Sequence, residues 1–344
     1  MRVLGVCAGN GVMLYPLRKY LIANIEPRSD YRTPGDVQWY LNFPIDHSLL
    51  YGFTPNYPMG RIDVMVGHPS CGHSSNLSYS RAKKLGDPRK DKSLELWFQC
   101  LQAYKPKIFF FENLPKILKQ IPIDEFQAKC GDYKLVVHNA SVGNFGNSQI
   151  SRVRLVIIGI KTKHFDKLSS YFQLPDLDLD SLKKTFELES GLNYPDPRLC
   201  HVREADDKVV CMEKDFKKLT LAQVKEIWNS KEYKNAKKWD ATTTGKGNMT
   251  KLPGVYRNLA NDFPLTARKQ NRQFNSKGEI MSPRELARIQ GVPDEFLLWY
   301  DPKRPGYCIN KARVTATKCP PMDLSYWFKR KLIKIRKHHG NIIH

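Results

Sequence analysis

Short apolar runs alternate with longer, more polar stretches through the first 160 residues of the chain. Runs of this kind, bounded by turn residues, are typical of the buried strands of a parallel sheet. They lie at residues 3–7, 21–25, 64–67, 108–111, 134–137 and 155–160. Their rhythm predicts a βαβ layout, in which strands of one sheet are joined by connections that cross its faces.

A helix is predicted between the runs at 64–67 and 108–111. Leu94, Trp97, Leu101 and Tyr104 fall at helical spacing and form one apolar stripe, which suits a crossover helix lying on a face of the sheet. Residues 1–160 are therefore expected to form an α/β domain with a doubly wound sheet.

The pattern changes after residue 160 to short polar and aromatic segments, so we expect a second, smaller domain over 161–280. Regular structure returns at Ser282, which can cap a helix that has Pro283 in its first turn and Glu285 three residues after the cap. Gly291 is expected to end this helix. The last part, 281–344, is predicted to contain a further helix from Met322. We expect a basic tail to follow that helix, with Lys329, Arg330, Lys331, Lys334, Arg336 and Lys337.

The charge of the chain indicates what kind of partner the protein binds. Lysine and arginine number 56 against 34 acids, for a formal net charge of +22, which favours a polyanionic partner over a merely basic surface. Between 229 and 278, 11 basic residues face three acids and are interleaved with aromatics, as in surfaces that bind nucleic acid. A solvated basic loop would look similar. The candidate contacts in this part of the chain are Lys246, Lys251, Arg257 and Arg268.

The eight cysteines contain no C-x-x-C pair, which argues against a zinc site and a disulfide framework, so no metal is predicted. The chain also opens without a leader-like segment and has no run of 18 apolar residues. These features predict a protein of the reducing cytoplasm, in a bacterial or phage-infected cell, with no membrane association.

A glycine turn follows the first apolar run, in the order Cys7, Ala8, Gly9, Asn10 and Gly11. Small residues in such a turn let a nucleotide-like ligand approach the backbone. Glu26 ends the next run, where an acid can accept hydrogen bonds from ribose hydroxyls. Taken alone, this combination is equally compatible with an ordinary turn and a surface acid.

The run at 64–67 leads into a loop that presents Cys71 in the order His68-Pro69-Ser70-Cys71-Gly72. A cysteine after a strand is more often a buried structural thiol than a nucleophile. The segments that follow favour the nucleophile over the structural thiol, because Asp87-Pro88-Arg89 and Glu112-Asn113-Leu114 come next in order. Further on come a Gln149-to-Gly159 element with Arg152 and Arg154, and the helix-like segment 282–294.

These five motifs in this order resemble the DNA cytosine-5 methyltransferase family, from one end of the chain to the other. The resemblance implies a Rossmann-like S-adenosylmethionine-binding catalytic domain at 1–160. It also implies a variable target-recognition domain within 161–280 and a return to the catalytic domain at 281–344.

The resemblance further implies roles for individual residues. Cys71 would add to carbon 6 of a cytosine flipped out of double-stranded DNA, Glu112 would share a proton with N3 of the base, and Arg154, with Arg152, would hold the base. Arg89 would contact DNA. The cofactor would meet the turn from Cys7 to Gly11, Glu26, Ser70 and Thr317.

The chain departs from the family pattern at a few positions. Ser70 replaces the proline before the nucleophile, Gly72 replaces a glutamine, and Thr317 replaces an asparagine near the cofactor's amino-acid tail. If Lys318 pointed into that pocket, a carboxylated cofactor would be favoured over ordinary S-adenosylmethionine.

Two other functions stay open at this point. One is a tRNA cytosine-5 methyltransferase, although its Cys-Phe-Thr signature is absent between 161 and 280; the other is a catalytically inactive DNA-binding homologue. The expected enzyme is a monomer on DNA, with a cognate restriction endonuclease as an optional partner. The recognised DNA site does not follow from the sequence.

Overall fold

The computed structural model describes residues 1–27, 42–43, 48–52, 55–72, 87–182, 184, 200–203, 208–211, 283–298, 312–317 and 319–343. The chain divides into two compact units. Unit 1 comprises Met1–Phe145, Val153–Asp176 and Met322–His344, and unit 2 comprises Gly146–Arg152 and Leu177–Pro321.

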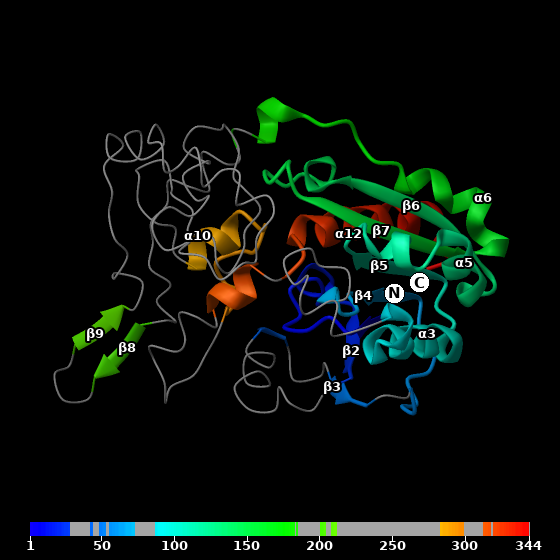
Figure 1. The fold of residues 1–344 in the computed structure, drawn as a ribbon, viewed down its shortest axis with the longest axis horizontal. Helices are drawn as coiled ribbons and strands as arrows, with labels where there is room; N and C mark the ends of the chain where they lie inside the picture. The colour runs from blue at the N-terminus through cyan, green and yellow to red at the C-terminus, as the bar shows by residue number, and fades with distance from the viewer. Residues whose placement is uncertain are drawn as a thin grey trace. The chain divides into compact units, whose positions relative to one another are not determined.

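Unit 1 contains a seven-stranded sheet with the order β3-β2-β1-β4-β5-β7-β6 (Figure 1). Five strands run parallel, while β7 pairs antiparallel with both β5 and β6. The strands are β1 (Val3–Val6), β2 (Leu21–Glu26), β3 (Ser48–Tyr51), β4 (Val64–Gly67), β5 (Ile108–Asn113), β6 (Tyr133–Ser141) and β7 (Val153–Lys161). All six strands expected from the sequence are present, and β3 is an addition at the edge of the sheet.

The helix expected between β4 and β5 is α3 (Lys92–Tyr104). Asp91 caps it, because its carboxylate accepts hydrogen bonds from the backbone N–H groups of Ser93 and Leu94. The described residues of unit 1 also form shorter helices: η1 (Tyr15–Leu17), η4 (Pro88–Lys90), α4 (Ile117–Gln120), α5 (Ile123–Cys130), η5 (Val142–Phe145), η6 (Thr162–His164), α6 (Phe165–Leu168) and η7 (Ser169–Phe172).

The C-terminal helix α12 spans Met322–His338 and corrects one expectation. The six basic residues from Lys329 to Lys337 lie within this helix and do not form a tail behind it. Leu324, Phe328, Leu332 and Ile335 give the helix an apolar stripe that packs on unit 1. Since this stripe continues past Lys329, burial extends the helix through the basic segment.

Strand β5 carries aromatic side chains to both faces of the sheet. Phe109 and Phe111 point to the face covered by α3, where Trp97 meets them with ring centroids 5.0 and 4.9 Å away. Phe110 points to the other face and meets Phe328 of α12 at 4.7 Å. Successive side chains of a strand point to opposite faces of the sheet, so the single apolar run of β5 contributes to the core on both faces.

Unit 2 contains the two-stranded sheet of β8 (Cys200–Arg203) and β9 (Lys208–Cys211), the helix α10 (Pro283–Arg288) and a helical segment at 312–317. Gly291 has a positive φ of 70°, which agrees with its predicted place behind the helix that includes α10. The division of residues 161–344 into a recognition domain and a return segment stays a prediction. Within the described ranges, the helices are all too short or too polar to cross a membrane.

Gly159 on β7 provides a test of how tightly the sheet and its aromatic layer fit. A Cβ atom there would lie 2.0 Å from Cε1 of Phe109, and that ring is held between Trp97 at 5.0 Å and Tyr133 at 5.2 Å. We expect Gly159→Ala to lower the free energy of unfolding by about 1–3 kcal/mol in urea titrations, because the ring cannot move aside.

Phe109→Leu should relieve part of this penalty, so the double variant should lose less than the sum of the two single variants. A loss below about 0.5 kcal/mol for Gly159→Ala would contradict the close fit.

Candidate active site

The carboxyl ends of the parallel strands β1, β4 and β5 meet at one edge of the sheet, where ligands bind in open α/β folds. Cys7 follows β1, His68 follows β4, and Glu112 lies near the end of β5. Strand β7 is antiparallel and begins at the same edge, with Leu155 opposite Asn113. The sheet therefore brings the start of β7, with Arg154, to the ends of the other three strands.

Two side chains fix the loop that carries Cys71. The Asn113 side-chain amide donates to the carbonyl oxygen of Pro69 at 3.1 Å, and Ser93 at the start of α3 accepts from the backbone N–H of Ser70 at 2.8 Å. Ser93 is itself hydrogen-bonded to Asp91, the cap of α3. The loop is thus tied to both β5 and α3 immediately before the cysteine.

The centre of the site is the carboxylate of Glu112, which has no exposed surface. Nδ1 of His68 contacts its Oε2 atom, and Nε of Arg154 lies 3.0 Å from its Oε1 atom. Arg154 is itself 14% exposed and His68 19%. A buried carboxylate requires such partners, because isolated charge is costly to remove from water.

Cys71 is half-buried and lies beside this group. Burial alone would raise the pKa of its thiol, but the hydrogen bond and the charge of His68, with a contribution from Arg154, lower it below the ordinary value. A thiol with a lowered pKa has a larger thiolate fraction, and the thiolate is the nucleophilic form. The arrangement around Cys71 therefore favours nucleophilic chemistry.

The glycine turn lies at the next strand end of the same edge. Cys7, Gly9 and Gly11 have positive φ values of 57, 57 and 78°, and a Cβ atom on Gly9 would meet nothing within 4 Å. Glu26 is buried at the end of β2 and accepts hydrogen bonds from the backbone N–H of Gly9 at 2.6 Å and from Asn24 at 2.8 Å. The open backbone beside an acid suits the predicted nucleoside, with Ala8 and Asn10 in the same turn.

Burial raises the pKa of Glu26 to about 7, although hydrogen bonds from Asn24 and Gly9 act in the opposite direction. Cys7 differs from Cys71, because burial and the neighbouring charge of Glu26 raise the pKa of its thiol well above the ordinary value. Its Sγ atom lies 3.4 Å from the carbonyl oxygen of Ser93. The Cys7 side chain is thus packed beneath the turn, and a contact between the Cys7 backbone and the cofactor stays a prediction.

The two arginines of the predicted base-binding pair have different surroundings. Arg154 belongs to unit 1 and pairs with Glu112. Arg152 belongs to unit 2, where its guanidinium donates to the side chain of Gln290 and to the carbonyl oxygen of Cys319. The ion pair at the candidate site is therefore made by Arg154.

The residues around Arg152 form a buried polar network within unit 2. Gln149 donates to the carbonyl oxygen of Ile289 at 2.9 Å and to Gln290 at 3.1 Å, and Asn147 donates to Ile289 at 2.9 Å. The Gln149–Arg152 element thus joins the segment that follows α10. This gives two of the five sequence motifs a structural role.

Thr317, a predicted cofactor contact, lies in unit 2 and is almost fully buried. Its hydroxyl donates to the carbonyl oxygen of Arg313 at 2.7 Å, one helical turn earlier. Only the acceptor lone pairs of that hydroxyl are left for a ligand. Lys318 lies outside the described residues.

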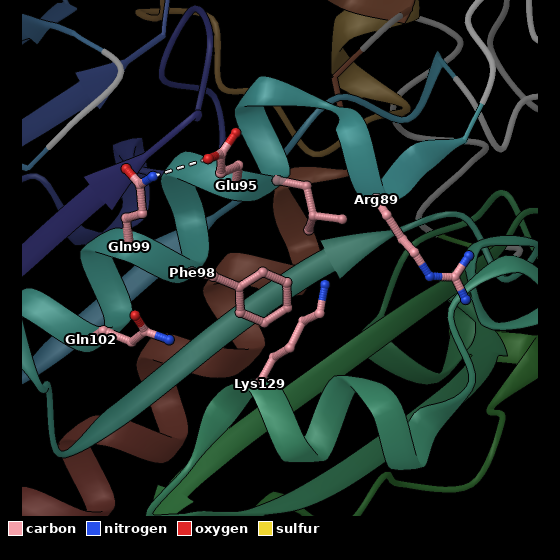
Figure 2. Close-up of a pocket in the computed structure, with 7 residues that line it drawn as sticks. Arg89, Glu95, Phe98, Gln99, Gln102 and Lys129 are labelled. Carbon is pink, nitrogen blue, oxygen red and sulfur yellow. Dashed lines mark hydrogen bonds between the residues drawn. The ribbon is translucent and has the colours of Figure 1, made fainter.

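Arg89, a predicted DNA contact, borders a cavity of about 290 Å³ over α3 and α5 (Figure 2). Its guanidinium makes a forked ion pair with Glu125, at 2.6–3.2 Å, and also contacts Asp87. The ammonium of Lys129 lies 5.5 Å from the centre of the Phe98 ring in the same cavity. None of the groups around Cys71 lines this cavity.

The remaining predicted DNA contacts lie outside the described residues. They are Lys246, Lys251, Arg257 and Arg268. Three described residues of the site received no role from the sequence: His68, Ser93 and Asn113. Asn113 belongs to the Glu-Asn pair, and His68 stands three positions before Cys71, so position alone could have marked both. Ser93 could not have been found in this way, because its partner Ser70 is 23 positions away.

The raised pKa of Glu26 predicts a pH dependence of cofactor binding. Ribose hydroxyls donate more strongly to an ionised carboxylate than to a protonated one. We therefore expect the affinity for S-adenosylmethionine to rise about tenfold from pH 6 to pH 8, as Glu26 loses its proton. Isothermal titration calorimetry at several pH values measures this change.

Glu26→Gln is the matched variant for this measurement, since it keeps the shape of the side chain and cannot titrate. Its affinity should be lower at pH 8, and its residual pH dependence reports the titration of the ligand alone. Identical pH profiles for the two proteins would show that Glu26 does not contact the ribose.

Comparison with known proteins gives a family for this arrangement. The family model for C-5 cytosine-specific DNA methylases matches residues 44–307. No curated protein matches the chain in sequence.

Two solved structures share the fold. A DNA modification methyltransferase encoded within a prophage (E. coli) has a TM-score of 0.59 at 16% identity, over 98% of this chain and 99% of that one. The Dnmt2 methyltransferase of S. pombe has a TM-score of 0.51 at 11% identity, over 98% of this chain and 99% of that one. These likenesses confirm the Rossmann-like fold. The matched family model covers well over half of the chain, which therefore belongs to the C-5 cytosine-specific DNA methylases, a family of S-adenosylmethionine-dependent methyltransferases.

Proposed function

We propose that this protein transfers a methyl group from S-adenosylmethionine to carbon 5 of a cytosine in double-stranded DNA, through a covalent bond between Cys71 and carbon 6. The observation that carries the proposal is the position of Cys71, with its lowered pKa, beside the ion pair of Arg154 with the fully buried Glu112. Nucleophile, carboxyl group and fixed positive charge are the groups that this chemistry needs.

Cytosine C5 is a poor nucleophile until a group adds to C6. The electron pair of the Cys71 thiolate forms the C6–S bond, and the displaced π electrons move toward C5 and N3. N3 then takes a proton that Glu112 delivers. The bound cofactor supplies an electrophilic methyl group. After C5 has taken that methyl, a solvent water takes the C5 proton, and the electron pair of the C5–H bond restores the C5=C6 double bond. The C6–S bond breaks with its electron pair returning to sulfur as thiolate, and N3 gives its proton back to Glu112.

The base must leave the duplex for Cys71 to reach C6, because stacking covers both faces of the ring. Arg154 keeps Glu112 in place and supplies positive charge where the base becomes electron-rich. The sequence also placed Arg152 in this role. We now assign it to Arg154 alone, because the Arg152 guanidinium is used by Gln290 and Cys319 within unit 2.

DNA is the proposed substrate for three reasons. The matched family is one of DNA methylases, the structurally similar prophage protein is described as a DNA modification methyltransferase, and the net charge is +22. Residues 161–280 are proposed to include the target-recognition domain. Action as a monomer in the cytoplasm, and a cognate restriction endonuclease, belong to the same proposal.

A trapping experiment tests both the nucleophile and the substrate. With S-adenosylmethionine present, methyl transfer leaves a C5 atom that bears fluorine and no proton. Fluorine cannot leave as a cation, so a working Cys71 should remain bonded to duplex DNA that contains 5-fluorocytosine. We expect a complex that survives denaturation, with mass spectrometry placing the adduct on Cys71. Because the recognised site is undefined, a pool of random duplexes is the substrate.

Cys71→Ser should abolish both the complex and methyl transfer, while Cys319→Ser, which alters another half-buried thiol, should retain them. The same assay with tRNA that contains the fluorinated base distinguishes the alternative substrate. Trapping by tRNA alone would overturn the DNA proposal, and binding of DNA without any trapping would identify an inactive homologue.

A second prediction concerns the basic face of α12. Arg330, Lys334 and Lys337 are exposed on this helix, and the described residues provide none of them with an acidic partner. If they lie against phosphates, replacing all three by glutamine should reduce the slope of log affinity against log salt by about 2–3, measured on duplex DNA by fluorescence anisotropy.

The matched control replaces Lys119, Lys163 and Lys167, three exposed lysines on other elements of unit 1. It removes the same charge and should leave the slope almost unchanged. Equal slopes for the two triple variants would exclude a specific phosphate-binding role for α12.

A further inference from the structure

His68 is the one member of the group around Cys71 that the proposed mechanism does not use. It follows β4 directly, and its Nδ1 atom contacts the Glu112 side chain and lies 3.2 Å from the Glu112 carbonyl oxygen. The ring also forms a hydrogen bond with the Cys71 side chain. A single imidazole therefore connects the nucleophile to the carboxyl group.

The charged groups that face His68 come from three elements and its own loop. Glu112 lies on β5, Glu26 lies on β2, and Cys71 lies in the loop; Arg154 of β7 acts on Cys71 and pairs with Glu112. Burial alone would lower the pKa of His68, but Glu112 and the hydrogen bond with Cys71 raise it to about 10. The same hydrogen bond lowers the pKa of Cys71. These opposite shifts are typical of a thiolate–imidazolium pair.

We propose that His68 is the proton partner of Cys71, taking the thiol proton to form a thiolate–imidazolium pair and relaying that proton through Glu112 to N3 of the cytosine. The first step concerns the protein alone. The relay to the base rests on the proposed function.

Every proton and electron pair in this route has a source and a destination. The S–H bond of Cys71 breaks and its proton passes to the imidazole, leaving an electron pair on sulfur. That pair forms the C6–S bond, while the imidazolium gives a proton to Glu112 as Glu112 gives one to N3. One proton equivalent has then moved from Cys71 to the base, Glu112 is again a carboxylate, and His68 is again neutral, with its proton on Nε2 in place of Nδ1. No other reactant is required.

Alkylation of Cys71 tests the first step without DNA or cofactor. The free protein is treated with iodoacetamide over a range of pH values, and mass spectrometry measures the rate for the peptide that contains Cys71. Cys7, Cys100 and Cys130 are an internal contrast, because burial raises the pKa of each and excludes reagent. In the parent protein, we expect the alkylation rate of Cys71 to rise with pH at a midpoint below that of an ordinary thiol.

His68→Gln keeps a hydrogen-bonding side chain but cannot carry a proton. Its midpoint should shift upward, and the alkylation rate at pH 7 should fall about tenfold for each pH unit of that shift. His164→Gln, on η6, is the matched control and should retain the parent profile. An unchanged profile in His68→Gln would overturn the proposal, whereas misfolding would alter circular dichroism and make the buried Cys7, Cys100 and Cys130 react as well.

A measurement on the unmodified protein covers the case in which His68→Gln does not fold. Nitrogen NMR of the histidine rings, assigned through variants, should show His68 doubly protonated through the neutral range. A His68 ring that titrates near pH 6.5, like a free histidine, would contradict the pair. If both experiments succeed while the 5-fluorocytosine trap fails, the proposed function is wrong and the ion pair stands.

Discussion

The burial of Glu112 is the constraint on which the rest of the site depends. A carboxylate with no exposed surface is compatible with a stable fold only when positive or hydrogen-bonding groups meet both of its oxygens. His68, in the loop after β4, meets one oxygen and Arg154 on β7 the other; β4 and β7 are the two neighbours of β5 in the sheet. Removing either partner would leave one oxygen of a buried carboxylate without its partner, so the residues proposed to perform the chemistry also hold each other in place.

The sheet supplies the register that this arrangement requires. Strands β4 and β5 run parallel with Gly67 opposite Phe111, which brings the residue after β4 to the level of Glu112. A Cβ atom on Gly67 would lie 2.5 Å from the ring of Trp97. Glycine at this position lets α3 pack directly on the end of β4, and Ser93 at the start of α3 then reaches the loop of Cys71. The packing of α3 on the sheet therefore also sets the position of the Cys71 loop.

Much of this framework followed from hydrophobic pattern, because buried strands and amphipathic helices leave strong periodic signals. Strand β3 was missed because Ser48–Tyr51 contains no β-branched residue, whereas β1 and β4, which have the same length, each contain valines. The pairing of Arg154 with Glu112 needed the structure, because Arg152 and Arg154 stand two positions apart and local sequence does not say which one reaches β5. The place of His68, three positions before Cys71, could have marked it as a candidate, but its contact with Glu112, 44 positions away, needed the structure.

The departures of the cysteine loop from the family pattern have a physical explanation in these contacts. Proline before a nucleophile restricts the backbone through its ring, but it has no N–H group to donate. Ser70 has this group and uses it to bind Ser93, while its hydroxyl accepts from the backbone N–H of Gly72 at 3.3 Å. Hydrogen bonds on both sides of Cys71 thus restrict the loop backbone here, in place of the proline ring of the family pattern. The loop remains anchored by α3 and by Asn113 of β5, so an atypical sequence is compatible with a nucleophile held against a buried carboxylate.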